Sequence, residues 1–273
     1  MRIRIVDAFT DRPFAGNPAA VVLLEPGPFP GDDRLQRLAA EVNLSETAYA
    51  RPLPEDSHAD WALRWFTPTT EVSLCGHATL ATVHVLRTTG AARRSVRFAT
   101  RSGILSAQTA EDGSITLDFP TAPLTEAKPG EELREALGAE VVSAHDTGEN
   151  VGDLLVELAD EQTVRALTPD LAAVARLPHR GVIVTARAAK EDAPYDYVSR
   201  FFGPAVGVDE DPVTGSAHTA LAPLWSARLG RETLTGFQAS ARTGLVRTTL
   251  RGDRTLLTGS AVTVIDGELL TWP

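Results

Sequence analysis

Two segments of this 273-residue chain place reactive side chains next to a glycine that is suited to begin a helix. Residues 75–77 read Cys-Gly-His, residues 211–218 read Asp-Pro-Val-Thr-Gly-Ser-Ala-His, and an Ala/Leu-rich run follows each glycine. The first N–H groups of a helix have no partner within the helix and carry the positive end of its dipole, so they can bind a carboxylate. Two such helix starts that meet would form a cleft for a carboxylated ligand.

A third polar cluster, residues 43–48, contributes the carboxylate of Glu46. Taken one at a time, these side chains have ordinary structural roles, and the spacing alone favours those roles. Ser45 is typical of a cap or turn residue, and Glu46 of a solvated glutamate in a loop. His77 is typical of a hydrogen-bonded core histidine, and Asp211 of a turn before a proline.

The elements that must position these residues are predicted from hydrophobic periodicity. Helices are predicted over residues 33–42, 76–86, 131–137 and 215–229. Strands are predicted over residues 3–8, 20–24, 62–66, 95–99, 104–109, 114–119, 154–158, 181–186 and 244–251. The sequence therefore predicts an α+β fold, in which a curved and mainly antiparallel sheet wraps around one long central helix in each half.

The two halves of the chain also repeat each other in the same order. The repeated features are a Gly/Asn turn before an apolar run (16–24 and 148–156), an Arg-aromatic-Phe segment before the glycine-started helix (64–66 and 200–202), and an Arg-Ser/Thr-Gly turn (101–103 and 242–244). Three matches in one order indicate a duplicated domain. The Pro-rich stretch 120–130 is the expected boundary.

Composition and charge narrow the function classes. The chain has 26 Lys+Arg against 36 Asp+Glu, and its net charge of −10 would repel nucleic acid and an anionic membrane surface. It has no charge-free run long enough for a transmembrane helix, and its start alternates like a strand instead of resembling a signal peptide. We therefore expect a cytoplasmic protein with no nucleic-acid or membrane partner. With Cys75 as its one cysteine, it can form neither an intrachain disulfide nor a Cys-rich metal site.

Four segments together resemble the PhzF family, which is named for an isomerase of phenazine biosynthesis and has the fold of diaminopimelate epimerase. They are residues 7–18, 44–48, 74–80 and 209–218, in the family's order and spacing. The resemblance implies two similar domains, each a mostly antiparallel barrel-like sheet around a central helix, with the active site in the cleft between them. It places the domains at 1–122 and 123–273, although the family's last strand can return to the first domain.

Carried over to this chain, the resemblance implies that Glu46 is the catalytic acid/base, with His77 and Asp211 as further catalytic residues. The substrate-binding positions that it implies are Asn17, Ser45, Gly76, Ala78, Gly215 and Ser216. The implied reaction moves a proton and a double bond in a small carboxylated substrate. A carbon acid needs fixed donors for the developing charge and a well-placed base, which such a site would supply. No metal and no cofactor is expected, and a homodimer is implied by the family.

Alternative functions remain open from the residues themselves. An epimerase or racemase of an amino-acid-like substrate would need two opposed bases, which Glu46 and Asp211 could supply; a two-thiol version is excluded because Cys75 is single. A hydrolase that uses Cys75 and His77 is disfavoured, because one intervening residue at a helix start should point the two side chains apart. A non-catalytic homologue that binds small molecules is the last alternative. Phenazine synthesis itself is not assumed.

Overall fold

The chain is divided into two units, which the C-terminal segment makes discontinuous in sequence. The computed structural model describes residues 1–55, 57–92 and 94–272. Unit 1 comprises Met1–Asp118 and Thr258–Pro273, and unit 2 comprises Phe119–Leu257. The sequence placed the boundary after residue 122, a few residues further on. Residues 258–273 belong to unit 1 because strand β17 (Ala261–Glu268) pairs antiparallel with strand β1 (Arg2–Ala8).

Unit 1 is a ladder of strands in which neighbouring strands of the sequence are mostly neighbours in the sheet. Its pairs run β17–β1–β2–β3–β4–β6–β7–β8, with the short β5 on β4. All are antiparallel except β2–β3 and β4–β6. The remaining bounds are β2 Asn17–Leu23, β3 Glu46–Pro52, β4 Trp61–Phe66, β5 Glu71–Val72, β6 Ser95–Thr100, β7 Gly103–Thr109 and β8 Ile115–Pro120.

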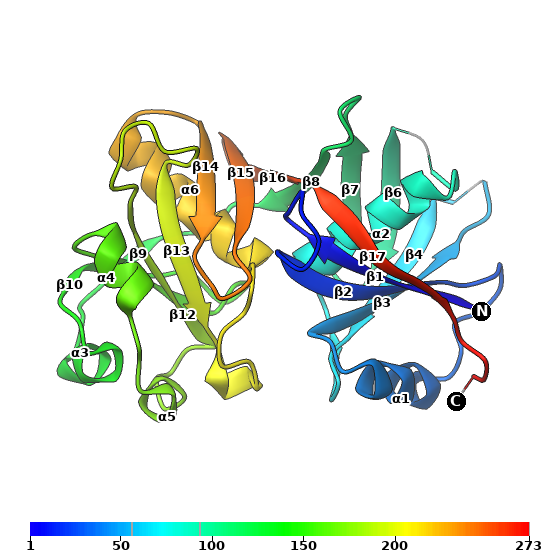
Figure 1. Cartoon of the computed structure of the whole chain (residues 1–273), viewed down its shortest axis with the longest axis horizontal. Helices are drawn as coiled ribbons and strands as arrows, with labels where there is room; N and C mark the ends of the chain where they lie inside the picture. The colour runs from blue at the N-terminus through cyan, green and yellow to red at the C-terminus, as the bar shows by residue number, and fades with distance from the viewer. Residues whose placement is uncertain (56, 93, 273) are drawn as a thin grey trace. The chain divides into compact units, whose positions relative to one another are not determined.

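The central helix of unit 1 is α2 (Gly76–Thr88), which packs on β1, β2, β3 and β17 (Figure 1). Every residue from His77 to Leu86 is buried, so this stretch of the helix is enclosed on all sides. Its threonine hydroxyls are satisfied by carbonyls one turn earlier in the chain. Helix α1 (Asp32–Val42) is amphipathic instead, and packs one face on Tyr49 and Phe66. The predicted sheet around one central helix is therefore confirmed in this unit.

Unit 2 repeats the pairing pattern of unit 1. The order β10–β11–β12–β13–β14–β15 alternates antiparallel and parallel pairs as β1–β2–β3–β4–β6–β7 does, and β9 pairs with β10. The duplication inferred from the sequence is thus confirmed in the topology. The strands are β9 Thr125–Ala127, β10 Val141–Asp146, β11 Asp153–Leu158, β12 Gly181–Arg187, β13 Tyr197–Phe202, β14 Thr233–Gln238, β15 Gly244–Arg251 and β16 Arg254–Gly259. The helices are α3 Glu131–Leu137, α4 Glu161–Ala166, α5 Leu171–Val174, the 3₁₀ turn η1 Pro204–Val206 and α6 Gly215–Leu229.

Strands β11 and β12 are apolar runs because both of their faces are buried. Leu155 and Ile183 lie in the core around α6, whereas Leu154 and Val182 lie in a second core with α3, α4 and α5. Helix α6 is the counterpart of α2, and is buried along most of its length (Figure 1). Among the described residues, every helix is too short or too polar to cross a membrane.

A repeated arginine explains the Arg-aromatic-Phe segments. Arg64 in β4 lies 5.0 Å over the ring of Phe66, and Arg200 in β13 lies 4.8 Å over the ring of Phe202. Each guanidinium also forms a two-pronged ion pair with a glutamate that precedes the buried helix, Glu71 for Arg64 and Glu210 for Arg200. The segment leading to each helix start is therefore anchored in the same way.

Candidate functional site

In unit 1, the starts of β2, β3 and α2 bring four polar side chains together. Asn17 is the first residue of β2, Glu46 the first residue of β3 and His77 the second residue of α2, while Cys75 immediately precedes that helix. Because β2 and β3 run parallel, their first residues lie at the same edge of the sheet. Glu46 therefore opens a strand, where the sequence had taken it as a loop residue.

The ring of His77 lies between the other three side chains. Its Nδ1 is 3.3 Å from the amide nitrogen of Asn17 and 3.5 Å from Cys75 Sγ, and its Nε2 is 3.1 Å from Glu46 Oε2. In either charge state Nε2 can carry a proton towards Glu46; when the ring is protonated, Nδ1 donates as well, and the Asn17 side chain meets it with its amide oxygen. The Nε2–Oε2 contact has ion-pair distance but not the alignment of a hydrogen bond, and neither atom has another hydrogen-bond partner among the described residues. Two buried atoms thus keep hydrogen-bonding capacity that a ligand could use.

The charge of His77 follows from these neighbours. Burial by itself would lower its pKa, but Cys75 and Glu46 outweigh burial and hold the pKa of His77 well above its ordinary value. Near neutral pH the His77 ring is therefore an imidazolium that faces the Glu46 side chain. Such a pair can donate one proton and accept another, which is what a proton-transfer reaction requires.

The contact between Cys75 and His77 corrects the sequence analysis, which expected their side chains to point apart. Cys75 has extended backbone geometry (φ −147°), so the turn into α2 brings its sulfur back to the imidazole. Burial and the charge of Glu46 nevertheless raise the pKa of the Cys75 thiol. Burial works against the thiolate, which is the nucleophilic form of cysteine, so the cysteine-hydrolase alternative stays disfavoured, for this reason instead of the geometric one.

Glu46, Cys75 and His77 are also residue types that bind zinc, and their donor atoms lie within 4.8 Å of one another. Here, however, the imidazole stands between the other two groups, with Nδ1 towards the sulfur and Nε2 towards the carboxylate. A single ion takes one ring nitrogen only. The arrangement fits a chain of proton donors and acceptors better than a tetrahedral ion site.

The other predicted residues of unit 1 lie around this cluster. Ser45 is partly buried and precedes Glu46, Gly76 is the first residue of α2, and Ala78 is fully buried in its first turn. The Ala78 N–H interacts with the Cys75 sulfur. The N–H groups of Gly76 and His77, at the start of α2, are left for water or a ligand.

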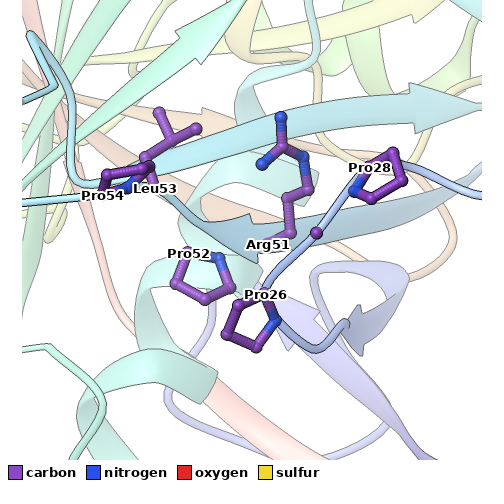
Figure 2. A pocket seen from close by; sticks show the side chains of 7 residues that line it. Pro26, Pro28, Arg51, Pro52, Leu53 and Pro54 are labelled. Carbon is purple, nitrogen blue, oxygen red and sulfur yellow. The ribbon is translucent and has the colours of Figure 1, made fainter.

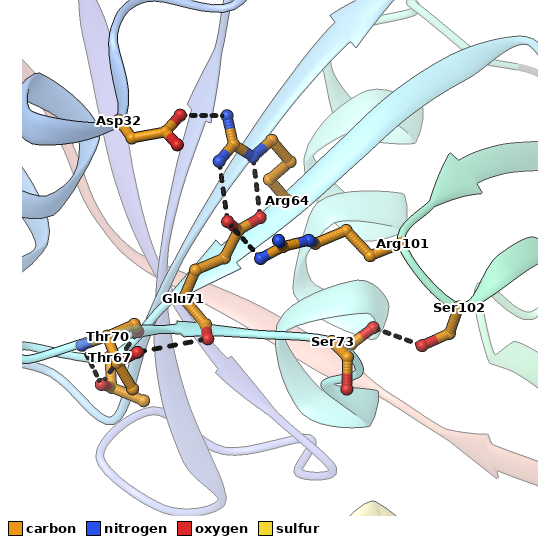
Figure 3. Close-up of polar contacts among 8 residues, drawn as sticks. All are labelled: Asp32, Arg64, Thr67, Thr70, Glu71, Ser73, Arg101 and Ser102. Atoms are coloured by element: carbon orange, nitrogen blue, oxygen red, sulfur yellow. Dashed lines mark hydrogen bonds and ion pairs between the residues drawn. The ribbon is translucent and has the colours of Figure 1, made fainter.

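A polar network fixes the segment that leads to Cys75 (Figure 3). Glu71 accepts hydrogen bonds from Arg64 at 2.8 and 2.7 Å and from Arg101 at 2.7 Å, and Arg64 also binds Asp32 in α1. Two residues further on, the carbonyl of Ser73 accepts from a serine hydroxyl at 2.8 Å. This network ties β4, β5 and the turn after β6 together, and so holds the start of α2 in position.

In unit 2, the segment before α6 is tied by a second network. Asp211 Oδ2 accepts from the hydroxyl of Thr214 at 2.5 Å, and the Thr214 N–H donates to the Gln238 side chain at 2.9 Å. Gln238 in turn donates to the Asp211 carbonyl at 2.8 Å. Gly215 is the first residue of α6 and is buried, and Ser216, the second, accepts from Arg180 at 3.1 Å. The structure thus brings Asp211 and Ser216 to the start of one helix, as the sequence predicted.

Three residues of unit 2 escaped the sequence analysis. Gln238 joins Asp211 to Thr214, and Arg180 joins Ser216 to Asp153, with which it forms a two-pronged ion pair. One signal could have found Asp153: it opens β11, the strand that corresponds to β2 in the repeated topology, as Asn17 opens β2 in unit 1.

The groove between residues 26–28 and 51–54 is a different kind of surface (Figure 2). It is lined by four prolines with Gly27, Leu53 and Arg51, and offers no carboxylate, thiol or imidazole. Arg51 is five residues beyond Glu46 in β3, which places it roughly 17 Å along the strand. This groove therefore lies apart from the Glu46–His77 pair.

Comparisons with known proteins agree on one family. The family described as "Phenazine biosynthesis-like protein" matches residues 6–267. An uncharacterized isomerase of Pseudomonas aeruginosa is 48% identical over 268 residues, which cover 97% of this chain and 96% of that protein. A PhzF-family crystal structure from Enterococcus faecalis has a TM-score of 0.89 at 39% identity and covers 99% of both chains. A hydroxyproline epimerase of Agrobacterium vitis shares the fold alone, with a TM-score of 0.62 at 14% identity over 98% of this chain and 91% of that one.

Proposed function

The chain belongs to the PhzF family, and on that premise we propose that it is a cofactor-independent isomerase that moves a proton, and with it a double bond, in a small carboxylated substrate. Isomerase is the activity for which its relatives from Pseudomonas aeruginosa and Halalkalibacterium halodurans are named. The single observation that carries the proposal is the Glu46–His77 pair, which is buried, 3.1 Å apart and incompletely hydrogen-bonded.

Glu46 acts as the base in this proposal. Its carboxylate takes a proton from a carbon next to a conjugated double bond, and the electron pair of that C–H bond shifts into the conjugated system. A proton then returns at the far end of the system, and the double bond moves, with no net change in composition. A positioned base of this kind contributes roughly 10²–10⁴-fold in rate.

His77 supplies the complementary acid. Its raised pKa keeps it protonated near neutral pH, so it can stabilise the negative charge that develops in the substrate, or return the proton. Asn17 keeps the ring in one orientation through Nδ1. The first N–H groups of α2 supply fixed donors, of which that of Gly76 is open and that of Ala78 is shared with the Cys75 sulfur. Ser45 lies beside the base.

Residues of unit 2 are proposed to bind and polarise the substrate. Ser216 and the N–H groups that follow Gly215 would hold the carboxylate, and Asp211 would accept or return a proton. The support is that Asp211 and Ser216 are gathered at one uncapped helix start, and that their side chains are polar in an otherwise buried segment. The proposal predicts that loss of either side chain lowers turnover without unfolding the protein.

An epimerase or racemase is the second candidate. It is favoured by the presence of Asp211 as a second carboxylate and by the fold shared with a hydroxyproline epimerase. The two candidates differ in the product: an isomerase shifts a double bond, whereas an epimerase inverts one stereocentre and leaves the bonding unchanged. A homologue that only binds its ligand would do neither.

The test is proton exchange with solvent. The protein is incubated in D₂O with trans-2,3-dihydro-3-hydroxyanthranilate and with cyclic amino acids that include trans-4-hydroxy-L-proline, and deuterium uptake is followed by NMR. Uptake with a shifted double bond supports the isomerase, and uptake with inversion supports the epimerase. Glu46→Gln should abolish uptake. Glu157→Gln is the matched control, because Glu157 is also a largely buried strand glutamate but binds Arg228 and Ser143.

Two further expectations are part of the proposal. The family implies a homodimer, which light scattering of the purified protein tests directly. A cytoplasmic location is tested by fractionation of the source cells.

A further inference from the structure

Arg180 joins two elements of unit 2 at the start of α6. It stands one residue before β12, and its Nε and Nη2 donate to the two carboxylate oxygens of Asp153 at 2.9 and 2.6 Å. The same Nη2 donates to Ser216 Oγ at 3.1 Å, and the guanidinium lies 5.2 Å over the ring of Phe201. The planar guanidinium of Arg180 therefore has little freedom to move, because Asp153, Ser216 and Phe201 all contact it.

Stability alone gives little reason for this ion pair. Asp153 is completely buried, and burial raises its pKa even though Arg180 acts in the opposite direction. Buried ion pairs are often no more stabilising than apolar side chains of similar volume, because desolvation offsets their attraction. A fully buried carboxylate at the start of a buried strand therefore calls for a specific task.

The task follows from the hydrogen-bonding chemistry of the three groups. A guanidinium only donates, so Ser216 Oγ accepts from Arg180, and the hydroxyl proton of Ser216 must point to a different acceptor. Ser216 is the second residue of α6, and Thr214 makes no side-chain hydrogen bond that caps this helix. The Ser216 O–H and the first N–H groups of α6 are thus donors at one place, next to a fixed positive charge.

Unit 1 has the same design at the corresponding place. There the first residue of the second strand, Asn17, holds the second residue of the buried helix, His77. In unit 2 the first residue of the corresponding strand β11, Asp153, binds Arg180, which in turn binds the second residue of the buried helix, Ser216. The duplicated fold has kept a side chain that orients the helix start in both units.

We propose that Arg180, fixed by Asp153, is a positioning residue that turns the Ser216 hydroxyl into a donor and thereby completes a binding site for a substrate carboxylate. This inference rests on the proposed function for the identity of the substrate as a carboxylic acid. It adds to the proposed function that Arg180, Asp153 and Ser216 make the site bind a carboxylate in preference to a neutral group.

The experiment measures binding without turnover. Anthranilate, a stable aromatic acid, and anthranilamide, its neutral counterpart, are titrated into the full-length protein by calorimetry. The variants are Arg180→Lys, Ser216→Ala and the double variant. Arg200→Lys is the matched control, because Arg200 forms the same two-pronged pair, with Glu210, and the same stacking, on Phe202. Its other hydrogen bonds go to the carbonyls of Val164 and Leu167, which lie outside α6.

We expect the wild-type protein to prefer anthranilate to its amide. Arg180→Lys should weaken anthranilate binding by roughly 10- to 100-fold, the usual cost of a hydrogen bond to a charged group, and should leave the amide unaffected. Because Arg180 acts through Ser216, Ser216→Ala should weaken binding by a smaller factor in the Arg180→Lys background than in the wild type. The same comparison in the Arg200→Lys background should show no such reduction.

Three results would overturn the proposal. They are the absence of a preference for anthranilate over the amide in the wild type, equal losses in Arg180→Lys and Arg200→Lys, and independent effects of Arg180→Lys and Ser216→Ala. Glu46→Gln separates this inference from the proposed function. That variant should bind anthranilate as the wild type does even though it loses proton exchange, so either claim can fail while the other holds.

Discussion

His218 should make the protein lose stability in mild acid, whereas His77 should not. His218 lies in the first turn of α6, is completely buried, and accepts a hydrogen bond at Nδ1 from the hydroxyl of Tyr197 at 2.9 Å. Burial lowers the pKa of His218 from 6.5 to about 3. Below pH 6.5 the unfolded chain therefore binds a proton that the folded protein does not bind until about pH 3. The stability that this group contributes is complete above pH 6.5 and is lost as the pH falls towards 3.

The size of the effect follows from the linkage of one proton. Each pH unit below 6.5 lowers the free energy of unfolding by about 1.4 kcal/mol, so this free energy falls by about 2 kcal/mol between pH 7.5 and pH 5. His218→Asn keeps an acceptor near the position of Nδ1 but cannot titrate. We expect it to lower stability at pH 7.5 by about 1–3 kcal/mol, because the lost ring leaves a cavity. Its further loss between pH 7.5 and pH 5 should be about 2 kcal/mol smaller than that of the wild type.

The assay is urea unfolding followed by ¹⁹F NMR of 5-fluorotryptophan at Trp225. This residue donates to Thr185 Oγ1 at 2.9 Å and stacks on Tyr197, so its signal reports on the packing around His218. The chain has four tryptophans, and Trp225→Phe assigns the signal. His58→Asn, at an exposed position, is the control and should leave the pH dependence unchanged. Equal pH dependence in His218→Asn and the wild type would refute the reasoning.

Four other outcomes are expected. Gly16→Ala should lower the free energy of unfolding of unit 1 by at least about 2 kcal/mol, because Gly16 has φ +65° and a Cβ would lie 2.2 Å from the Ala8 carbonyl oxygen. Thermal unfolding measures this, and an unchanged transition would contradict the prediction. The Cys75 thiol should resist Ellman's reagent at pH 8 in the folded protein and react after unfolding, because burial raises the pKa of the thiol. Rapid labelling of the native protein would restore the hydrolase alternative. Glu71→Gln should lower the free energy of unfolding by about 2 kcal/mol and should also lower turnover, because Arg64 and Arg101 lose the carboxylate to which both bind before α2. Wild-type stability and turnover in this variant would show that the network does not position the helix. The rate of proton exchange should decline as the pH rises through the raised pKa of His77, and His77→Gln should not show this decline. If the variant and the wild type both show it, the decline belongs to another group.

Much of the fold could be predicted because its signals are local. The four predicted helices are present, and both buried helices begin at the predicted glycines. Strand β3 was missed because its residues Thr47–Ala50 are all buried, so the alternation that marks a strand is absent and alanine has little preference for a sheet. Strand β13 was missed because Ser199 and Arg200 interrupt its apolar pattern; the serine is buried and the arginine is neutralised by Glu210.

The candidate site was predictable only in part, because its contacts are tertiary. Motif resemblance selected Glu46 and His77, and the structure places them 3.1 Å apart. No spacing rule could show that the turn into α2 brings Cys75 to His77. Likewise, Arg180 and Ser216 are 36 residues apart in sequence and meet only because β12 begins beside the start of α6. The residues proposed to do the chemistry were found from local motifs, whereas those that contact and orient them required the structure.

Deuterium uptake by substrate carbon in the wild type and in Glu46→Gln tests the central claim most directly. We predict that the wild type incorporates solvent deuterium into trans-2,3-dihydro-3-hydroxyanthranilate or another member of the carboxylic acid panel and shifts its double bond. Glu46→Gln should incorporate none, while Glu157→Gln behaves as the wild type. Uptake by Glu46→Gln at the wild-type rate would contradict the assignment of Glu46 as the base, and with it the account of this site.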